Sequence, residues 1–117
     1  MANTFKLVTK AGVTTADVIY TVAGSTTTVV LGIMLGNTTS SQITATVTIE
    51  SDTSNRAGAN NEANQNVELV TNAPIPSGAS LELLAGNKVI METTDVLRVD
   101  CSVADKLSGT LSIMEIT

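Results

Sequence analysis

Two closely spaced pairs of carboxylates are the residues of this 117-residue chain best suited to acid–base chemistry. Glu92 with Asp95, and Glu50 with Asp52, would supply the two carboxyl groups that a glycosidase needs. Both pairs fall at the ends of predicted strands beside turns, where carboxylates ordinarily face solvent or cap the turn. We therefore interpret all four as structural residues, and we predict no catalytic residue and no enzymatic activity.

The composition favours that interpretation, because the sequence contains no histidine. Histidine is the commonest general base and a preferred transition-metal ligand, so Ser-His-Asp and Cys-His arrangements and His-based zinc sites are excluded. The single cysteine, Cys101, lies in the alternating stretch RVDCSVAD. It has no histidine to activate it and no second cysteine to pair with, so we expect a buried core thiol.

A long polar segment at 51–66, SDTSNRAGANNEANQN, separates two predicted strands. Its length and low hydrophobicity favour either a solvated excursion or a segment that orders against a neighbouring subunit. A calcium site of the EF-hand type would need acidic residues at alternate positions and a glycine, but this segment has Thr53, Ser54 and Arg56 there. We therefore predict no metal and no other cofactor. The oxygen-bearing side chains that calcium would otherwise use are Asp52, Asn55, Asn60, Asn61, Glu62 and Asn64.

The charge of the chain is acidic and dispersed, with 6 Lys and Arg, 11 Asp and Glu, and a net charge of -5. Nucleic-acid binding needs basic residues on one face, and stacking against bases or sugars needs aromatic rings, of which Phe5 and Tyr20 are the only ones. The longest apolar run, 29–36, is too short to span a bilayer, and the N-terminus lacks the apolar core of a signal peptide. We expect a soluble protein made in the cytoplasm, with no nucleic-acid or membrane partner.

Alternation of apolar and polar residues with a period of two predicts half-buried β-strands along most of the chain. It is clearest in QITATVTIE at 42–50 and in VLRVDCSV at 96–103. Shorter strands are expected near 5–9 and at 17–22, 67–70, 80–84, 88–91 and 110–116. The residues expected to face the core in the two clearest strands are Ile43, Ala45, Val47, Ile49, Leu97, Val99, Cys101 and Val103.

Two segments differ from this simple alternation. The stretch TTTVVLGIMLG at 26–36 is apolar on both faces, which is typical of a central strand covered on each side or pressed against a neighbouring subunit. Gly32 within it predicts a bulge or a close backbone approach. The N-terminal segment 1–12 is expected to be an arm or an edge strand whose Phe5, Leu7 and Val8 close the sandwich edge or reach another chain.

Turn residues divide the strands at 23–26, 36–42, 85–87, 93–95 and 104–109. Both prolines, Pro74 and Pro76, fall in TNAPIPSG, which predicts a stiff extended crossing that ends one strand before the next begins. We count eight or nine strands and find no convincing amphipathic helix. The pattern predicts an all-β protein, an antiparallel β-sandwich of jelly-roll type in one domain that spans 1–117.

The order of these features resembles small virion structural proteins of tailed bacteriophages, including marine and cyanobacterial ones. The resemblance covers nearly the whole chain through YTVAGSTTTVVLGIMLGNTTSSQITATVTIE, VELVTNAPIPSGASLELLAGNKVIMETTDVLRVD and SGTLSIMEI. It implies a multi-copy β-sandwich that is made in the host cytoplasm and located in the virion. It brings no catalytic, metal-binding or cofactor-binding residue.

The resemblance leaves several functional hypotheses open. The first is a capsid decoration or cement protein that contacts the major capsid protein and other copies of itself, as a trimer or larger ring. The second is a subunit associated with the tail, neck or fibre, contacting other virion proteins. The third is a receptor-binding or glycan-binding module that presents the loop at 51–66.

Overall fold

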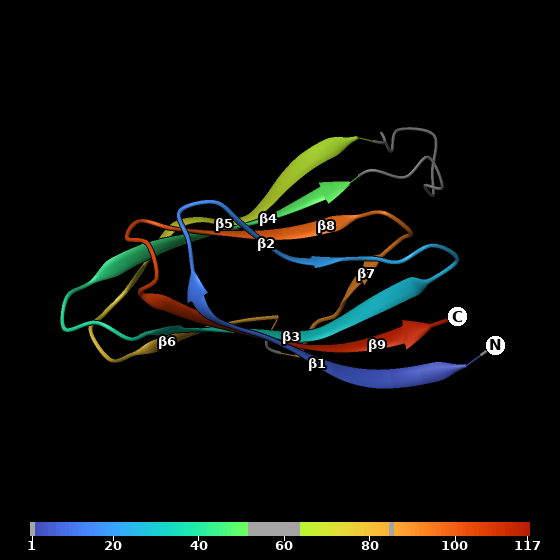
Figure 1. Ribbon diagram of the computed structural model, residues 1–117, viewed down its shortest axis with the longest axis horizontal. Coiled ribbons are helices and arrows are strands. Elements are labelled where there is room, and N and C mark those ends of the chain that lie inside the picture. Colours follow the sequence, from blue (N-terminus) through green and yellow to red (C-terminus); the bar gives the residue numbers. More distant parts are fainter. Residues whose placement is uncertain (1, 52–63, 85) are drawn as a thin grey trace.

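A computed structural model describes residues 2–51, 64–84 and 86–117, and within these ranges the chain forms nine β-strands and no helix. The prediction of an all-β sandwich is confirmed, and several strands run longer than predicted because the alternation continues into the flanking residues (Figure 1). The strands are β1 (Asn3–Val13), β2 (Asp17–Thr21), β3 (Thr27–Asn37), β4 (Ile43–Ser51), β5 (Gln65–Ile75), β6 (Ser80–Leu83), β7 (Val89–Met91), β8 (Val96–Cys101) and β9 (Leu107–Ile116).

The strands form two antiparallel sheets that lie one above the other (Figure 1). Sheet A has the order β1-β9-β3-β6, with β7 also paired to β3, and sheet B has the order β2-β8-β4-β5. In sheet A β1 pairs with β9, and the strands next to them in the sequence, β2 and β8, pair with each other in sheet B. In the same way β3 pairs with β6 in sheet A, and their sequence neighbours β4 and β5 pair in sheet B. Such wrapping of paired strands from one sheet to the other is the topology of a jelly roll.

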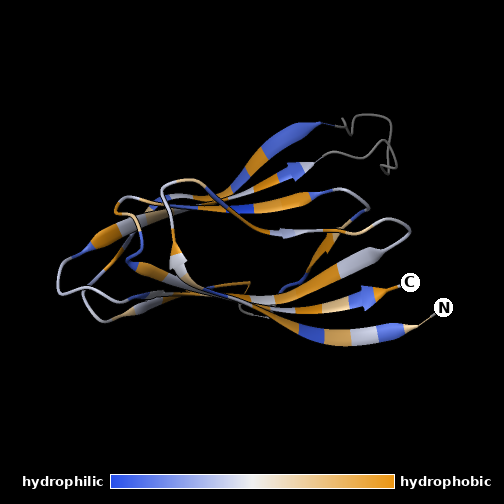
Figure 2. Ribbon diagram, in the orientation of Figure 1, coloured by the Kyte–Doolittle hydropathy of each residue, from blue (hydrophilic) through white to orange (hydrophobic). Residues whose placement is uncertain are grey.

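One hydrophobic core lies between the sheets and is shared by both. Figure 2 shows hydrophobic and hydrophilic residues alternating along the strands, as the period of two predicts. Ile49 is half-buried, and Val103 is 46% exposed because β8 ends at Cys101 and the chain turns there, so the inward placement predicted for Val103 is wrong. The other predicted core residues of β4 and β8 are buried: Ile43, Ala45, Val47, Leu97, Val99 and Cys101.

The strand predicted to be central, β3, does pair on both sides, with β9 along one edge and with β6 and β7 along the other. Its register against β9 shifts between Val30 and Gly32, which confirms the bulge predicted at Gly32. Among the described residues, only one of its faces is covered by other strands. Val30, Ile33 and Leu35 are buried in the core, whereas Met34 on the opposite face is 47% exposed.

The proline-containing corner differs from its prediction. The strand does not end before the prolines: β5 continues through Pro74, which lies opposite Thr44 of β4, and ends at the buried Ile75. Proline is tolerated there because β5 is the edge of sheet B and the missing N–H faces no further strand. The turn itself uses Pro76, whose carbonyl accepts a hydrogen bond of 3.0 Å from the backbone N–H of Ala79, and Gly78, whose φ is 68°.

Two predicted loops are shorter than expected. Residues 107–109, predicted as part of a turn, begin β9, since Leu107 is fully buried and continues the inward alternation. Ser51 ends β4, and β5 begins at Gln65, so both ends of the predicted 51–66 loop belong to strands. The remainder, 52–63, lies outside the described residues. Across the described ranges, no helix long and apolar enough to cross a membrane is present.

Candidate interaction surface

An apolar row crosses four strands on the outer face of sheet A. Directly opposite residues of antiparallel strands point to the same side of a sheet, so the pairs Phe5–Met114, Met114–Val29 and Val29–Ile90 place four side chains in line. Ile113, the neighbour of Met114, is buried in the core, which means that the row faces outward. Phe5 is 72% exposed and Ile90 is 63% exposed.

Two more exposed side chains enlarge this row into a patch. Leu7 lies opposite Ser112 on the same face, and Met34 lies opposite Thr110. Exposed apolar patches of this kind commonly mark contact surfaces, because isolated monomers rarely present them without a partner. We refer to this patch as the apolar face; its members are Phe5, Leu7, Val29, Met34, Ile90 and Met114.

A shallow groove lies within the apolar face at Gly32. It has a volume of about 130 Å³ and is lined by Gly32, Ile33, Met34, Glu82, Thr110 and Ser112. A Cβ added at Gly32 would meet no atom within 4 Å, and the same holds at Gly36 on the same face of β3. The monomer therefore gives no packing reason for these two glycines, and without a Cβ they leave room for another backbone to approach the sheet closely.

The outer face of sheet B has the opposite character. Along β4 the residues on this face are Thr44, Thr46, Thr48 and Glu50, of which Thr48 is covered and only 8% exposed, and the neighbouring β8 contributes Arg98. The Nε of Arg98 donates a hydrogen bond of 2.8 Å to Oε2 of Glu50, and both side chains are about 30% exposed. The outer face of sheet A thus carries an apolar patch beside hydroxyl residues such as Thr110 and Ser112, whereas the outer face of sheet B carries threonines, a charge pair and the exposed Val18.

The first predicted carboxylate pair has a structural role. The Oδ2 of Asp95 accepts a hydrogen bond of 2.9 Å from the backbone N–H of Glu92, and the backbone N–H of Asp95 donates to the carbonyl of Glu92 at 3.0 Å. Asp95 is 2% exposed, while Glu92 is half-buried. The geometry is that of a capped turn between β7 and β8, as the sequence predicts.

The second pair is only partly within the described ranges. Glu50 is engaged with Arg98, and Asp52 lies outside the described residues, as do the candidate calcium ligands Asn55, Asn60, Asn61 and Glu62. Asn64 is described, with a φ of 60°. It lines a polar depression of about 260 Å³ together with Glu50, Ser51, Asn66 and Val96. The prediction that the segment at 51–66 contacts a partner stays a prediction.

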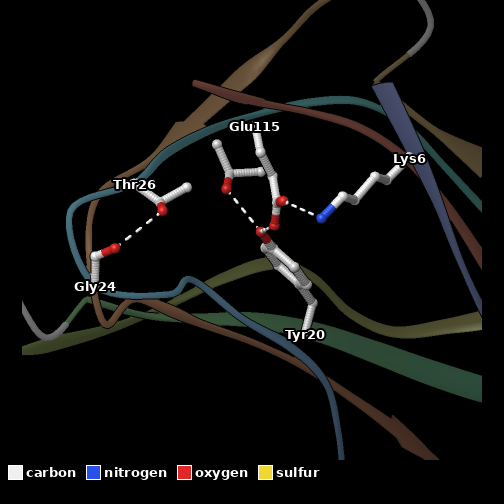
Figure 3. A network of polar contacts seen from close by, with 6 residues as sticks. Lys6, Tyr20, Gly24, Thr26 and Glu115 are labelled. Carbon is white, nitrogen blue, oxygen red and sulfur yellow. Dashed lines mark hydrogen bonds and ion pairs between the residues drawn. The ribbon is translucent and has the colours of Figure 1, made fainter. Parts of the chain in front are cut away.

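A polar network that no sequence pattern predicted connects the two sheets (Figure 3). The hydroxyl of Tyr20 on β2 donates a hydrogen bond of 2.6 Å to Oε2 of Glu115 on β9, whose Oε1 lies 2.7 Å from Nζ of Lys6 on β1. Because the single Tyr20 proton goes to Glu115, the 2.7 Å contact with Thr28 on β3 has the Thr28 hydroxyl as donor. Four strands meet in this network.

The network's pKa shifts indicate a structural function. Burial, followed by the hydrogen bond to Glu115, raises the pKa of Tyr20 to about 12. The hydrogen bonds from Lys6 and Tyr20 lower the pKa of Glu115. At neutral pH the phenol therefore keeps its proton and the carboxylate stays ionised, so neither group exchanges a proton readily, as a general acid or base must.

Two further observations concern metal and thiol chemistry. Within residues 2–51, 64–84 and 86–117, no group of three or more Cys, Asp or Glu side chains is placed to hold a metal ion. Cys101 is 3% exposed in the core, as predicted for a structural thiol.

Comparison with family models, with curated proteins and with solved structures gives no match for this chain. The surface is therefore interpreted from its own geometry. Phe5, Leu7 and the doubly apolar stretch at 26–36 could be seen in the sequence, but the row they form depends on the register between strands, which the sequence does not display.

Proposed function

We propose that this protein is a non-enzymatic structural component of a phage virion, most directly a capsid decoration or cement protein. In this role it stabilises the particle by contacts with the major capsid protein and between copies of itself. The apolar face with its Gly32 groove is the observation that carries the proposal. The sequence resemblance to small virion proteins supports it, whereas the jelly-roll topology alone does not discriminate, because capsid proteins, lectins and cupins all use it.

The contrast between the two outer faces suggests how the protein sits in a particle. The hydroxyl-rich face of sheet B is suited to solvent, and the apolar face of sheet A gains free energy when it is covered. We expect the apolar face to lie against the particle and the outer face of sheet B to face outward. The small glycine-lined groove would then receive a side chain or a backbone segment of the capsid surface.

The copy number of the protein in purified particles tests the role itself. Quantitative mass spectrometry should find hundreds of copies for a decoration protein. About a dozen copies or fewer would assign the chain to the tail, neck or fibre instead, and absence from the particle would reject a virion role.

A matched pair of substitutions tests the contact surface. Gly32→Leu fills the groove, and because that position is open in the monomer, the melting temperature should change by no more than about 3 °C. Co-sedimentation with particles that lack the protein should fall at least tenfold, by our estimate, since the added side chain blocks close approach. Gly24→Leu in the β2–β3 turn, equally open, should bind like the wild type. Equal binding by all three proteins would show that another surface contacts the particle.

A further inference from the structure

The N-terminal strand β1 has a free edge whose hydrogen-bonding geometry can be assigned residue by residue. Ala2 and Thr117 exchange both backbone hydrogen bonds, at 3.0 and 2.9 Å. From Asn3 to Lys10 the register against β9 then continues without a shift. Bonded and non-bonded pairs alternate in an antiparallel ladder, so Thr4, Lys6, Val8 and Lys10 direct their backbone groups toward β9. The N–H and C=O groups of the alternate residues, Asn3, Phe5, Leu7 and Thr9, point to the free edge.

Two of these residues, Phe5 and Leu7, also belong to the apolar face and are its members on β1. Phe5 and Leu7 are 72% and 66% exposed, and no described strand pairs with their edge. A long regular edge of this kind is a template for another strand. The other described edge strands are interrupted or short: β5 has register shifts, a positive φ at Asn72 and Pro74, whereas β2, β6 and β7 span five residues or fewer.

We propose that the free edge of β1 pairs with β1 of a second copy of this chain, antiparallel and in a two-fold register centred on Leu7. The pairing would join the two copies of sheet A into one continuous sheet, with the apolar faces side by side. It does not rest on the virion role, because it can be measured on the purified protein. It specifies a two-fold contact, whereas the sequence-based expectation, from the default of closed symmetry, is a trimer or larger ring.

Two observations favour a second copy as the occupant. The undescribed segment 52–63 reads DTSNRAGANNEA, which contains no large apolar side chain to cover Phe5 and Leu7. An antiparallel pair of identical strands, in contrast, is self-complementary, and a two-fold contact closes on itself without further growth. Each copy then supplies the backbone donors and acceptors that the other needs.

The charges on β1 select the register. Two-fold pairing that uses the free backbone groups and keeps most of β1 paired can be centred on Phe5, Lys6, Leu7 or Val8. The Val8 register is unfavourable, because it sets Lys6 opposite Lys10 of the second copy. Centring on Lys6 would set two ammonium groups directly opposite each other, which is unfavourable. Centring on Phe5 would place the exposed Leu7 opposite the polar Asn3 of the second copy. The Leu7 register places Lys6 opposite Val8 of the second copy and Phe5 opposite Thr9, and the charge of Lys6 is already matched by Glu115 at 2.7 Å.

Cysteine cross-linking tests the proposal directly. In the Leu7 register the two Leu7 Cα atoms lie about 5.5 Å apart, within disulfide range, whereas the two Phe5 Cα atoms lie roughly 14 Å apart. Under mild oxidation Leu7→Cys should therefore form a covalent dimer and Phe5→Cys should not. A mixture of Phe5→Cys and Thr9→Cys proteins should cross-link to each other. Two controls measure non-specific cross-linking. One is Val18→Cys, at a position on β2 that is 45% exposed, and the other is the wild-type protein, whose Cys101 is buried.

Sedimentation velocity of the unmodified protein is the second test of the proposed dimer. Because the contact consists of one pair of strands, we expect reversible dimers with a dissociation constant of the order of 10 µM. Leu7→Pro removes an edge N–H without removing a hydrogen bond to β9, so it should abolish the dimer and leave the monomer folded. A wild-type protein that stays monomeric at several hundred micromolar, or a Phe5→Cys protein that cross-links as readily as Leu7→Cys, would overturn the proposal.

Discussion

Tyr20 shows how a single residue connects the two sheets. It is the only tyrosine of a chain that contains no tryptophan, and its hydroxyl reaches from sheet B to Glu115 and Thr28 of sheet A. Burial has the largest effect on its ionisation and raises its pKa, and its two polar neighbours act in opposite directions. Glu115 raises the pKa of Tyr20 by accepting its proton in a hydrogen bond and by its negative charge, while the hydroxyl of Thr28 lowers it by donating to the phenol oxygen.

Spectroscopic titration of this lone tyrosine is our first prediction. Absorbance near 295 nm should report a midpoint near pH 12 in the folded protein. Glu115→Gln should move the midpoint toward the ordinary value, because it removes the neighbouring negative charge. Thr28→Val should move it the other way, because it removes the donor that favours the phenolate. A wild-type midpoint at the ordinary tyrosine value, or shifts of the same sign in the two variants, would contradict the network.

The same shift fixes the sign of the pH dependence of stability. The folded pKa of Tyr20, about 12, exceeds the ordinary value of 10.0, so between these values the unfolded chain has lost a proton that the folded chain keeps. The stabilisation is therefore complete below pH 10 and is lost as the pH rises toward 12. Glu115, whose pKa is lowered, contributes stability above its unfolded pKa that is lost on acidification through its folded pKa.

At the scale of elements, one buried side chain connects β3 with the end of β5. The Nδ2 of Asn37, at the end of β3, donates to the carbonyls of Ser41, Ile75 and Pro76 at 2.8, 2.9 and 3.1 Å. Its Oδ1 accepts from the backbone N–H of Thr39 at 2.9 Å. The residue is 5% exposed, so these carbonyls have little access to water if the amide is lost. The proline corner is thus held by Asn37 as well as by its own stiff backbone.

Removing this amide is our second prediction. Asn37→Ala should lower the free energy of unfolding by about 2–4 kcal/mol, because it leaves buried carbonyl groups without a donor. Asn37→Asp should be at least as damaging, since it places a carboxylate oxygen against three carbonyl oxygens. Ser77→Ala, which removes an exposed 3.1 Å hydrogen bond to Thr39, should cost less than about 0.5 kcal/mol. Chemical denaturation measures all three, and an aspartate variant milder than alanine would contradict this account.

The elements also show what the sequence could and could not predict. Period-two alternation identified β4 and β8 and their buried residues, because each strand has one face in the core and one in solvent. It wrongly placed Val103 in the core, because β8 ends at Cys101 and the alternation no longer applies beyond it. It also ended β5 before Pro74, which is tolerated inside that strand only because β5 lies at the edge of its sheet. The apolar face and the Tyr20 network combine strands from distant parts of the chain. Predicting them needs the sheet order and register, which no local pattern contains.

At the scale of the whole molecule, the two ends of the chain lie side by side and complete sheet A together (Figure 1). β1 is paired with β9 over its whole regular length, and Val8 packs against the core. Within the described residues, the N-terminal segment forms an edge strand of sheet A. Its removal would uncover one edge of β9 beside Leu111 and Ile113, each 1% exposed.

Deleting residues 2–10 is our third prediction. It removes a ladder of backbone hydrogen bonds worth about 1 kcal/mol each, together with the Lys6–Glu115 ion pair, and the sum is comparable with the roughly 5–15 kcal/mol that stabilises a domain. The truncated chain should lose cooperative thermal unfolding by calorimetry. Leu7→Pro is the matched control, because it alters only the outer edge of β1 and should still unfold cooperatively. If the truncated chain melted cooperatively within a few degrees of wild type, β1 would be dispensable to the fold, and its pairing with β9 would contribute little to stability.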